Sequence, residues 1–595
     1  MVFLPPKWVP ELPFDPPDSI PLSEFMLNEQ YGRYPLHQSR QPFTCGLTGC
    51  GYSALEVRDR VDKLARALSK ELGWKPTEGT EWDKVIGIFS LNTIDTLTLS
   101  WAIHSLSGIS SPANAAYSRA ELEYQLKSSG SKALFTCLPL LPIALEAAAL
   151  SGIPKNRVYL LALPKEATGG LASPPVSKTV DQLIQDGEML PPLEKLQWQK
   201  GDGARKTAFL CYSSGTSGLP KGVMISHRNV ISNVLQIAAS EKLHRDSKQE
   251  PSSKYGMTEV VLGLLPQSHI YSLVVICHAT TYRGDQVINL PKFDFQQFLN
   301  SIQTFRVNNL PLISTDHLHD WGSQVPPIII LMAKNKAALE KFDLSSVRSI
   351  FTGAAPLGAE TAEKLQSQYP SWKIRQGYGL TETSTVVCAT AFHDILLGSS
   401  GSLLPSVQAK IVSIEGTEIT GYDQPGELVV KSPSVVLGYL NNSKANKETF
   451  QDGWMRTGDE ALVRMSPQGN EHIFIVDRIK ELIKGLQVAP AELEAHLLTH
   501  PAVGDAAIIP VPDDAAGELP KAFIVKSSSV SLEDNDRILV REIQKYVEEH
   551  KARHKWLKGG VQFVDVIPKS PSGKILRRLL RDQDREARRQ KGPKL

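Results

Sequence analysis

Residues 207–226 read TAFLCYSSGTSGLPKGVMIS, and this stretch decides the fold. It opens with a short apolar run, Ala208 to Tyr212, of the kind that forms a strand buried on both faces of a parallel sheet. A loop rich in glycine and hydroxyl residues follows, from Ser213 to Gly222, and Ser226 can then cap a helix. This order is typical of a layered α/β domain that binds its ligand at the carboxyl ends of its strands.

The loop has the composition of a binding site for a polyphosphate. Glycines let successive backbone N–H groups converge on one point, hydroxyl groups add donors, and a lysine adds positive charge. It is not a Walker A loop, because Pro220 precedes Lys221 and Gly222 follows it. The alternative, a flexible surface linker, is disfavoured between a buried strand and a capped helix. The predicted phosphate-binding residues are Ser213, Ser214, Gly215, Thr216, Ser217, Gly218 and Lys221.

The α/β pattern continues on both sides of this loop, from about residue 53 to residue 290. Ser53 and Glu56 form a capping-box pair ahead of an amphipathic run that Gly73 closes, which predicts a helix. Residues 85–89 (VIGIF) predict a second buried strand. Near residues 477–484 an apolar strand gives way to a charged, glycine-containing segment, so we predict one domain over residues 1–479 and a smaller one over 480–595.

The composition disfavours nucleic-acid-binding, disulfide-rich, zinc-binding and membrane-spanning proteins. A formal net charge of +2 makes nucleic acid an unexpected partner, and the basic tail after residue 574 is interpreted as a solvated helix face. The six cysteines contain no CxxC pair, which favours reduced thiols in an intracellular protein over a disulfide framework or a zinc site. The N-terminus lacks a secretion signal, and the most apolar stretch, 134–154, is interrupted by prolines and a glutamate. We therefore expect a soluble protein without a transmembrane segment.

Two further segments carry residues that can contact an apolar group or a flat ring. In residues 265–271 (LPQSHIY), His269 and Tyr271 can pack against an acyl group and still hydrogen-bond, although a lone histidine is more often a satisfied core residue. The small residues Gly353, Ala354 and Ala355 allow a flat ring to approach the backbone.

Residues 376–382 (QGYGLTE) and 454–459 (WMRTGD) add aromatic and acidic groups. Tyr378 can stack on the ring, whereas the alternative for residues 377–379 is an ordinary turn. Glu382 offers the hard carboxylate ligand that Mg²⁺ prefers. Asp459 is an acceptor-only carboxylate suited to a diol, with a solvated aspartate as its alternative.

Together these motifs resemble the adenylate-forming superfamily of acyl- and aryl-CoA synthetases, peptide-synthetase adenylation domains and luciferases. The resemblance covers residues from about 30 to 580 in the expected order and is strongest to the 4-coumarate:CoA-ligase-like branch. It implies an α/β fold with a large multi-layer N-terminal AMP-binding domain and a smaller mobile α+β C-terminal domain that carries a catalytic lysine. It also implies an ATP- and Mg²⁺-dependent ligase that forms acyl-AMP and pyrophosphate, then rotates the small domain and transfers the acyl group to coenzyme A.

The resemblance assigns roles to individual residues. Lys574, in residues 571–578 (PSGKILRR), would meet the substrate carboxylate and the α-phosphate oxygens, which is electrostatic stabilisation rather than proton transfer. Thr381 would contact the α-phosphate, and Lys480 would be the hinge. Lys484 and Gln487 belong to the loop that enters the site for the thioester step. The remaining positions would hold the nucleotide (Gln376, Gly377, Tyr378, Asp459, Arg478), the metal (Glu382) and the acid (His269, Tyr271, Gly353, Gly377).

Two departures from the family pattern stand out. Relatives place two more residues between Lys484 and the following glycine, which puts the geometry of the thioester step in question. Residues 309–324 (NLPLISTDHLHDWGSQ) carry an insertion of roughly a dozen residues, either a surface loop or an intron translated by mistake.

Alternatives for the activity also stay open at this point. An adenylating enzyme could deliver its acyl group to a carrier protein, although none follows before Leu595, and an inactive member of the fold is a second rival. The acid itself is not named by the sequence. The final residues, Pro593-Lys594-Leu595, resemble a peroxisomal Ser-Lys-Leu address and slightly favour the peroxisome, with its import receptor as partner, over the cytoplasm.

Overall fold

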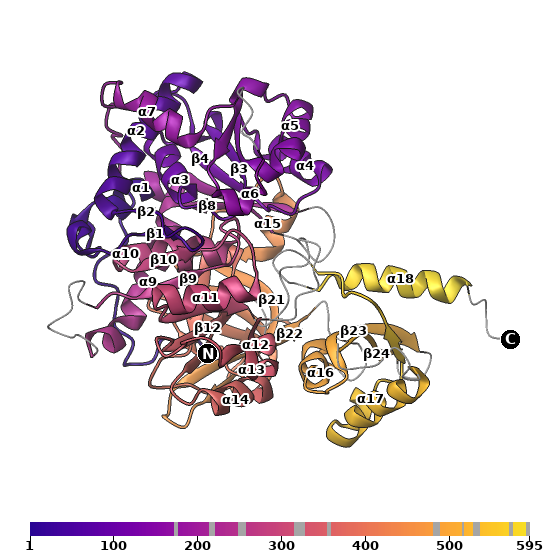
Figure 1. Cartoon of the computed structure of the whole chain (residues 1–595). Coiled ribbons are helices and arrows are strands. Elements are labelled where there is room, and N and C mark those ends of the chain that lie inside the picture. The colour runs from indigo at the N-terminus through magenta and orange to yellow at the C-terminus, as the bar shows by residue number, and fades with distance from the viewer. Residues whose placement is uncertain are drawn as a thin grey trace.

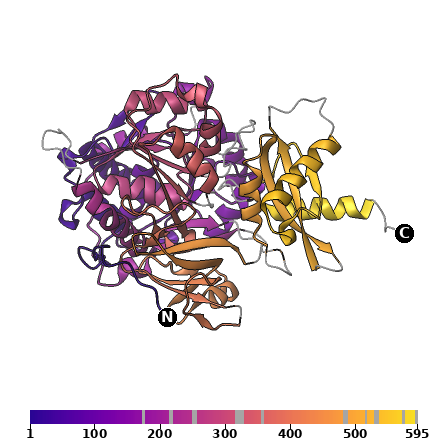
Figure 2. The ribbon, with the colours of Figure 1, turned by 90° about the horizontal axis from the view of Figure 1, so that it is seen from below.

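The computed structural model describes residues 1–171, 177–213, 220–247, 257–313, 328–353, 357, 359–413, 415–479, 483, 488–513, 517–527, 536–569 and 575–590. Figure 1 shows a large body made by the chain up to the orange segments and a smaller body, orange to yellow, that ends in helix α18. The view from below in Figure 2 shows the same division. The predicted α/β class, with a large N-terminal and a smaller C-terminal domain, is confirmed.

Two mostly parallel sheets form the centre of the large domain. The first has the order β19 (Gly438–Tyr439), β8 (Lys221–Ser226), β7 (Thr207–Ser213), β4 (Ile109–Ala113), β3 (Val85–Phe89), β5 (Ala133–Cys137) and β6 (Val158–Leu161). The second has the order β15 (Ser402–Leu403), β14 (Thr385–Ala389), β13 (Lys373–Leu380), β12 (Ser349–Gly353), β11 (Asn309–Ile313), β9 (Val260–Gly263), β10 (Gln286–Asn289), β1 (Phe43–Cys45) and β2 (Gly51–Tyr52).

A third sheet completes the large domain, and a fourth belongs to the small one. The third contains β17 (Glu418–Ile419), β16 (Gln408–Val412), β18 (Gly426–Lys431), β21 (Trp454–Met465) and β20 (Phe450–Gln451), with β22 (Glu471–Arg478) paired to β21. In the small domain, β23 (Val503–Asp513), β24 (Gly517–Lys526) and β25 (Val561–Phe563) form a sheet with its own buried apolar clusters.

Helices cover these sheets. In the large domain the described α-helices are α1 (Leu22–Leu27), α2 (Ala54–Leu72), α3 (Thr96–Ser105), α4 (Arg119–Ser129), α5 (Leu141–Leu150), α6 (Lys165–Thr168), α7 (Val180–Glu188), α8 (Asp202–Arg205), α9 (His227–Asp246), α10 (Thr280–Tyr282), α11 (Phe295–Phe305), α12 (Ile328–Lys334), α13 (Lys336–Leu339), α14 (Ala359–Gln368) and α15 (Ser443–Thr449). The small domain has α16 (Pro490–Leu497), α17 (Asp536–His550) and α18 (Arg577–Gln590). Within the described ranges every helix is too short or too polar to span a lipid bilayer.

Local signals predicted several elements well. Ser53 and Glu56 form the reciprocal capping box of α2, and Gly73 ends that helix in the left-handed conformation. The strands predicted at residues 85–89 and 208–212 are β3 and β7, and Ser226 caps α9 by accepting from the Asn229 backbone N–H. These predictions succeeded because each depends on neighbouring residues only.

One prediction needs correction, and another needs narrower bounds. The segment from Ser213 to Gly222 is not a loop throughout, because Ser213 ends β7 and Lys221 and Gly222 begin the antiparallel strand β8. Residues 309–324 were predicted to carry an insertion of roughly a dozen residues, and the first five, 309–313, are not part of it because they form strand β11 between β9 and β12. The alternating apolar residues Leu310 and Leu312 are fully buried there, which a surface loop could not achieve. The rest of that segment lies outside the described residues.

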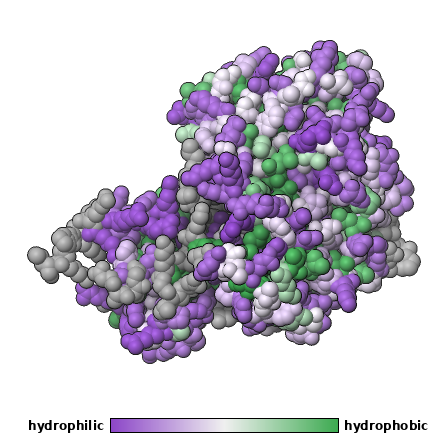
Figure 3. Space-filling view, turned by 180° about the vertical axis from the view of Figure 1, so that it is seen from behind, coloured by the Kyte–Doolittle hydropathy of each residue, from purple (hydrophilic) through white to green (hydrophobic). Residues whose placement is uncertain are grey.

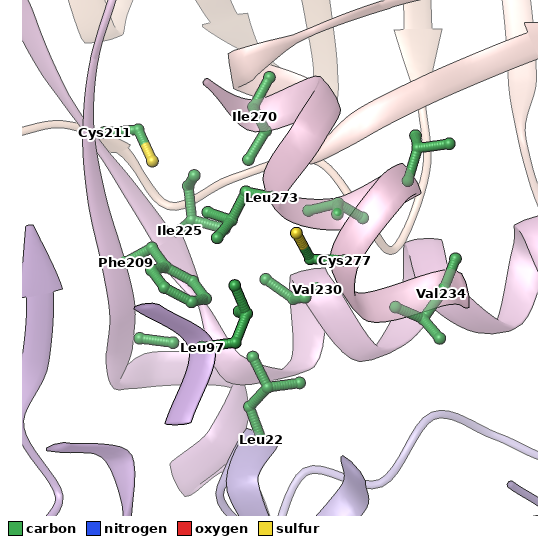
Figure 4. Packing of buried hydrophobic residues seen from close by; sticks show 14 of the residues in the cluster. Leu22, Leu97, Phe209, Cys211, Ile225, Val230, Val234, Ile270, Leu273 and Cys277 are labelled. Atoms are coloured by element: carbon green, nitrogen blue, oxygen red, sulfur yellow. The ribbon is translucent and has the colours of Figure 1, made fainter. Parts of the chain in front are cut away.

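The largest core cluster joins the first sheet to the helices that carry the site. Figure 4 shows Phe209 of β7 facing Leu97 of α3 and Val230 of α9, with Leu273 nearby. Leu273 belongs to a π-helix, η6 (Tyr271–Ala279), whose residues are all buried. The core therefore fixes the segment that begins at Tyr271. The face in Figure 3 is mostly hydrophilic, with smaller hydrophobic patches on the large domain.

Candidate active site

The predicted site residues gather where strands of the first and second sheets end. Ser213 is the last residue of β7, and Gly353 is the last residue of β12. Strand β13 runs parallel to β12, pairs Gln376 with Thr352, and leads into the short helix η8 (Thr381–Thr383). Carboxyl ends of parallel strands are where α/β proteins place ligands, so the predicted location is reasonable on topology alone.

Four side chains meet at what we call the phosphate corner: Ser213, Lys221, Glu382 and Tyr439. The Ser213 hydroxyl Oγ lies 3.5 Å from Oε1 of Glu382, which links the end of the first sheet to the end of β13. Ser213 is also the strand partner of Lys221, so the two residues that flank the predicted phosphate loop are held side by side. The corner thus presents a hydroxyl, an ammonium group and a carboxylate around the ends of that loop.

Tyr439 is the member of this corner that sequence reasoning missed. Its hydroxyl donates to Oε1 of Glu382 at 2.8 Å, and the Lys221 ammonium lies 4.6 Å from the centre of its ring. Burial and the neighbouring Glu382 raise the pKa of the Tyr439 hydroxyl, so it stays protonated and remains a donor. Tyr439 lies at the corner because β19 pairs with β8, and no local sequence pattern predicts that pairing.

A second group, Tyr378, Asp459 and Arg478, matches the predicted nucleoside site. The Tyr378 hydroxyl donates to Oδ2 of Asp459 at 2.6 Å, and Nε of Arg478 lies 3.2 Å from Oδ1. Asp459 and Arg478 are direct partners in the β21–β22 ladder, which explains why residues 19 positions apart act together. A carboxylate has about four acceptor positions, which suits a residue that several donors approach.

Glycines at the ends of β12 and β13 allow close packing at the predicted acid site. A Cβ on Gly377 would lie 2.6 Å from the Phe351 ring, and a Cβ on Gly353 would lie 3.3 Å from the Gly377 carbonyl oxygen. The hydroxyl of Tyr271 donates to the Phe351 backbone oxygen at 2.7 Å. Gly353, Gly377 and Tyr271 are therefore brought together around Phe351, a residue that the sequence did not single out.

His269 lies just before this group and is half-buried. Burial lowers its pKa to about 4, so the imidazole is neutral near pH 7. Its Nδ1 accepts from the Tyr271 backbone N–H at 3.3 Å, which places the ring proton on Nε2. This environment is consistent with the neutral imidazole that we expected beside an acyl group.

Thr381 begins η8, and the backbone just beyond it is strained. Ser384 has φ of 52° and the β-branched Thr385 has φ of 115°. Such values are costly for residues with a Cβ and persist only where the surrounding structure enforces them. Here the backbone of Gly379 packs directly against the backbone of Thr385 and holds it in place. A Cβ added to Gly379 would lie only 1.5 Å from the Thr385 carbonyl oxygen.

The predicted small-domain residues are flanked by well-anchored positions. Ile483 and Val488 form an antiparallel bridge and are both buried, on either side of residues 484–487. Lys569 and Ile575 form another bridge, and Lys569 pairs with Asp505 at 2.7 Å. Several predicted residues lie outside the described ranges, so their roles stay predictions: Ser214, Gly215, Thr216, Ser217, Gly218, Ala354, Ala355, Lys480, Lys484, Gln487, Lys574 and the terminal tripeptide.

Comparison with known proteins identifies the family of the chain. A family model for AMP-binding enzymes matches residues 39–440, and one for the AMP-binding enzyme C-terminal domain matches residues 492–574. The acyl-CoA ligase easD of Emericella nidulans is 42% identical over 98% of this chain and 100% of its own length. The acyl-CoA ligase cm3C of Cordyceps militaris is 40% identical over 98% of this chain and 90% of its own length.

A solved structure shows the same fold over nearly the whole chain. The anthranilate CoA ligase AuaEII in complex with anthranoyl-AMP superposes with a TM-score of 0.78 at 21% identity, covering 96% of this chain and 98% of that one. The family matches and the acyl-CoA ligase relatives define an adenylate-forming enzyme. The chain belongs to the AMP-binding enzyme family, and both family matches fall inside the two predicted domains, whose boundary at residues 479 and 480 stays a prediction.

Proposed function

We propose that this chain carries out both half-reactions of an acid–CoA ligase at the corner described above. The chain is an ATP-dependent acyl-CoA ligase: it activates a carboxylic acid as acyl-AMP, with release of pyrophosphate, and transfers the acyl group to coenzyme A. Within the family we place it in the 4-coumarate:CoA-ligase-like branch, which the segment around His269 and Tyr271 supports.

Different side chains bind different parts of ATP. Lys221 and Ser213 flank the phosphate loop and supply a positive charge and a donor to phosphate oxygens. Tyr378 and Asp459 hold the nucleoside, with the Asp459 carboxylate steadied by Arg478. Lys574 neutralises the charge that accumulates when the substrate carboxylate attacks the α-phosphorus in line.

Glu382 fits a magnesium ion that accompanies ATP. Its Oε1 accepts from Tyr439, whereas Oε2 makes no hydrogen bond within the described residues, and the Ser213 hydroxyl is close by. The described part of the chain has no group of three or more His, Cys, Asp or Glu side chains that could hold a metal. One carboxylate with substrate phosphates is the usual way in which proteins bind Mg²⁺, and the bound ion would neutralise phosphate charge.

The observation that supports this function best is the meeting of Ser213 of β7, Lys221 of β8 and Glu382 of η8 at one corner. The test is ATP–pyrophosphate exchange with a panel of carboxylic acids, followed by loss of the free CoA thiol in the presence of the best acid. We expect exchange without CoA and thiol loss with it. Exchange without thiol loss would mean that the acyl acceptor is another molecule, and no exchange with any acid would refute adenylation.

A further inference from the structure

A narrow cavity lies behind the acid end of the site. Its walls are mostly apolar and include Ile237 of α9, Val275 of η6, Val386 of β14 and Leu404. Phe351 belongs both to the cavity and to the site, because its ring lines the cavity and also packs against Gly377. If the carboxylate end of the acid lies at Gly353 and Gly377, this cavity is the enclosed space next to its acyl group.

A chain of alternating charges ends in the wall of this cavity. Arg375 pairs with Glu241 at 3.1 Å, and Glu241 pairs with Arg283 at 2.8 Å. Arg283 and Arg245 then share Asp285, at 3.0 and 2.7 Å, and Arg245 lies 3.7 Å from Glu259. We call these six residues the charge chain. Arg375 and Glu241 line the cavity, as does Arg283, whereas Asp285, Arg245 and Glu259 lie beyond it.

Two polar groups in the cavity wall lack full partners. Within the described residues the hydrogen bonds of Arg375 use only Nε, to the Thr390 carbonyl oxygen, and Nη1, to Glu241. Arg375 is 3% exposed, and its Nη2 group makes no hydrogen bond within the described residues. Asn309, 8% exposed, has a side-chain oxygen without any hydrogen-bond partner in the described chain. A buried polar group without a protein partner needs water or a ligand to complete its hydrogen bonds, and this one faces a cavity.

We propose that Arg375 and Asn309 select a carboxylic acid whose acyl part carries a neutral oxygen, a hydroxyl or keto group, at the end remote from the carboxylate. The inference rests on the proposed function and names its substrate class. A guanidinium and an amide can together donate to and accept from such an oxygen, while the apolar wall covers the carbon chain. A second carboxylate is disfavoured, because Glu241 already pairs with Arg375 and would repel it.

Matched acids test this selection. The probes are hexanoate, octanoate and decanoate, each beside its ω-hydroxy and dicarboxylic counterparts, together with cinnamate and 4-hydroxycinnamate. We expect the best hydroxy acid to exceed its unsubstituted match by about tenfold or more in kcat/KM for pyrophosphate exchange. A buried site built to hydrogen-bond a hydroxyl group discriminates strongly against the analogue that lacks it.

Variants locate the preference. Asn309→Leu keeps a similar volume and leaves no other group unpaired, so it should fold and reduce the hydroxyl preference. Arg375→Met should reduce it further, and the double variant Arg375→Met/Glu241→Gln removes the charge together with its partner if the single variant is unstable. Arg464→Met changes a half-exposed arginine of β21 paired with Asp423, and it should leave the preference unchanged.

The outcomes separate the two proposals. Equal or better use of unsubstituted acids, a preference for the dicarboxylic acids, or a hydroxyl preference that survives in both cavity variants would overturn the selection while leaving acid–CoA ligation intact. Absence of exchange with every acid would overturn the proposed function, and this inference with it.

Discussion

The phosphate corner and the small-domain anchors are built in opposite ways. Glu382 meets Ser213 across 169 positions of sequence and Tyr439 across 57, so the corner exists only once two sheets are in place. The bridges Ile483–Val488 and Lys569–Ile575 join residues that are close in sequence. The corner therefore forms only in the folded large domain. In the small domain, local pairing fixes the residues on either side of each predicted catalytic loop, so the loops can move together with that domain.

This difference predicts a division of labour. The large domain should determine nucleotide and acid binding, and the small domain should determine which half-reaction proceeds. Variants in the two regions should then alter different kinetic quantities, and the four predictions that follow test that separation.

The largest effect is expected for Lys574→Ala in the small domain. Adenylation should fall on the order of 10²–10³-fold, because a preorganised charge at the reacting phosphate is lost. Transfer from pre-made acyl-AMP to CoA should remain. The measurement is single-turnover kinetics of each half-reaction, with the exposed Lys558→Ala as the control. Equal loss of both half-reactions would contradict the division.

Glu382→Gln should have the next largest effect. A neutral amide is a poorer ligand for a hard dication, so the Mg²⁺ concentration for half-maximal adenylation should rise about tenfold or more. Tyr439→Phe removes the hydrogen bond to Glu382 but keeps its charge, and it should shift the Mg²⁺ dependence less. Magnesium titration of pyrophosphate exchange measures both. An unchanged dependence in Glu382→Gln would remove Glu382 from the metal site.

A smaller effect is expected from inserting Tyr-Lys between Lys484 and Gly485. Two extended residues add several ångströms of reach, at about 3.3–3.6 Å each, while the buried ends at Ile483 and Val488 stay paired. We expect thioester formation to be the slower step in the natural chain and to become several-fold faster in the insertion variant, with pyrophosphate exchange unaltered. If CoA transfer is already faster than adenylation, or the insertion slows it, the short loop is compensated elsewhere.

The smallest expected effect is that of pH through His269. Its folded pKa of about 4 lies below the ordinary value near 6.5, so protonation opposes folding and its contribution to stability falls as pH drops from about 6.5 towards 4. Between about pH 5.5 and 8 the ring stays neutral. The pH–rate profiles of wild type and His269→Asn should then have the same shape. An inflection near pH 6.5 that disappears in the variant would show that His269 titrates during turnover.

Sequence alone predicted the parts of this enzyme that depend on neighbouring residues. The capping box at Ser53 and the buried strands needed only local patterns, and family motifs identified Glu382 and Asp459. Tyr439 was missed because its place depends on which strand lies beside β8. The segment 309–324 was predicted to carry an insertion, and the place of Asn309 at the start of a core strand beside the cavity depends on contacts with β9 and β12 that the sequence does not show.

The charge chain has a consequence for how this enzyme could acquire a new substrate. Arg375 shares Glu241 with Arg283, and Arg283 shares Asp285 with Arg245, so each member depends on the next. Replacing Arg375 leaves Glu241 paired with Arg283 alone, so the balance of buried charge along the chain changes, and changes of this kind are costly in a buried network. Single substitutions at Arg375 should therefore be strongly epistatic with Glu241. An evolutionary or laboratory change of acid preference should need paired replacements rather than independent steps.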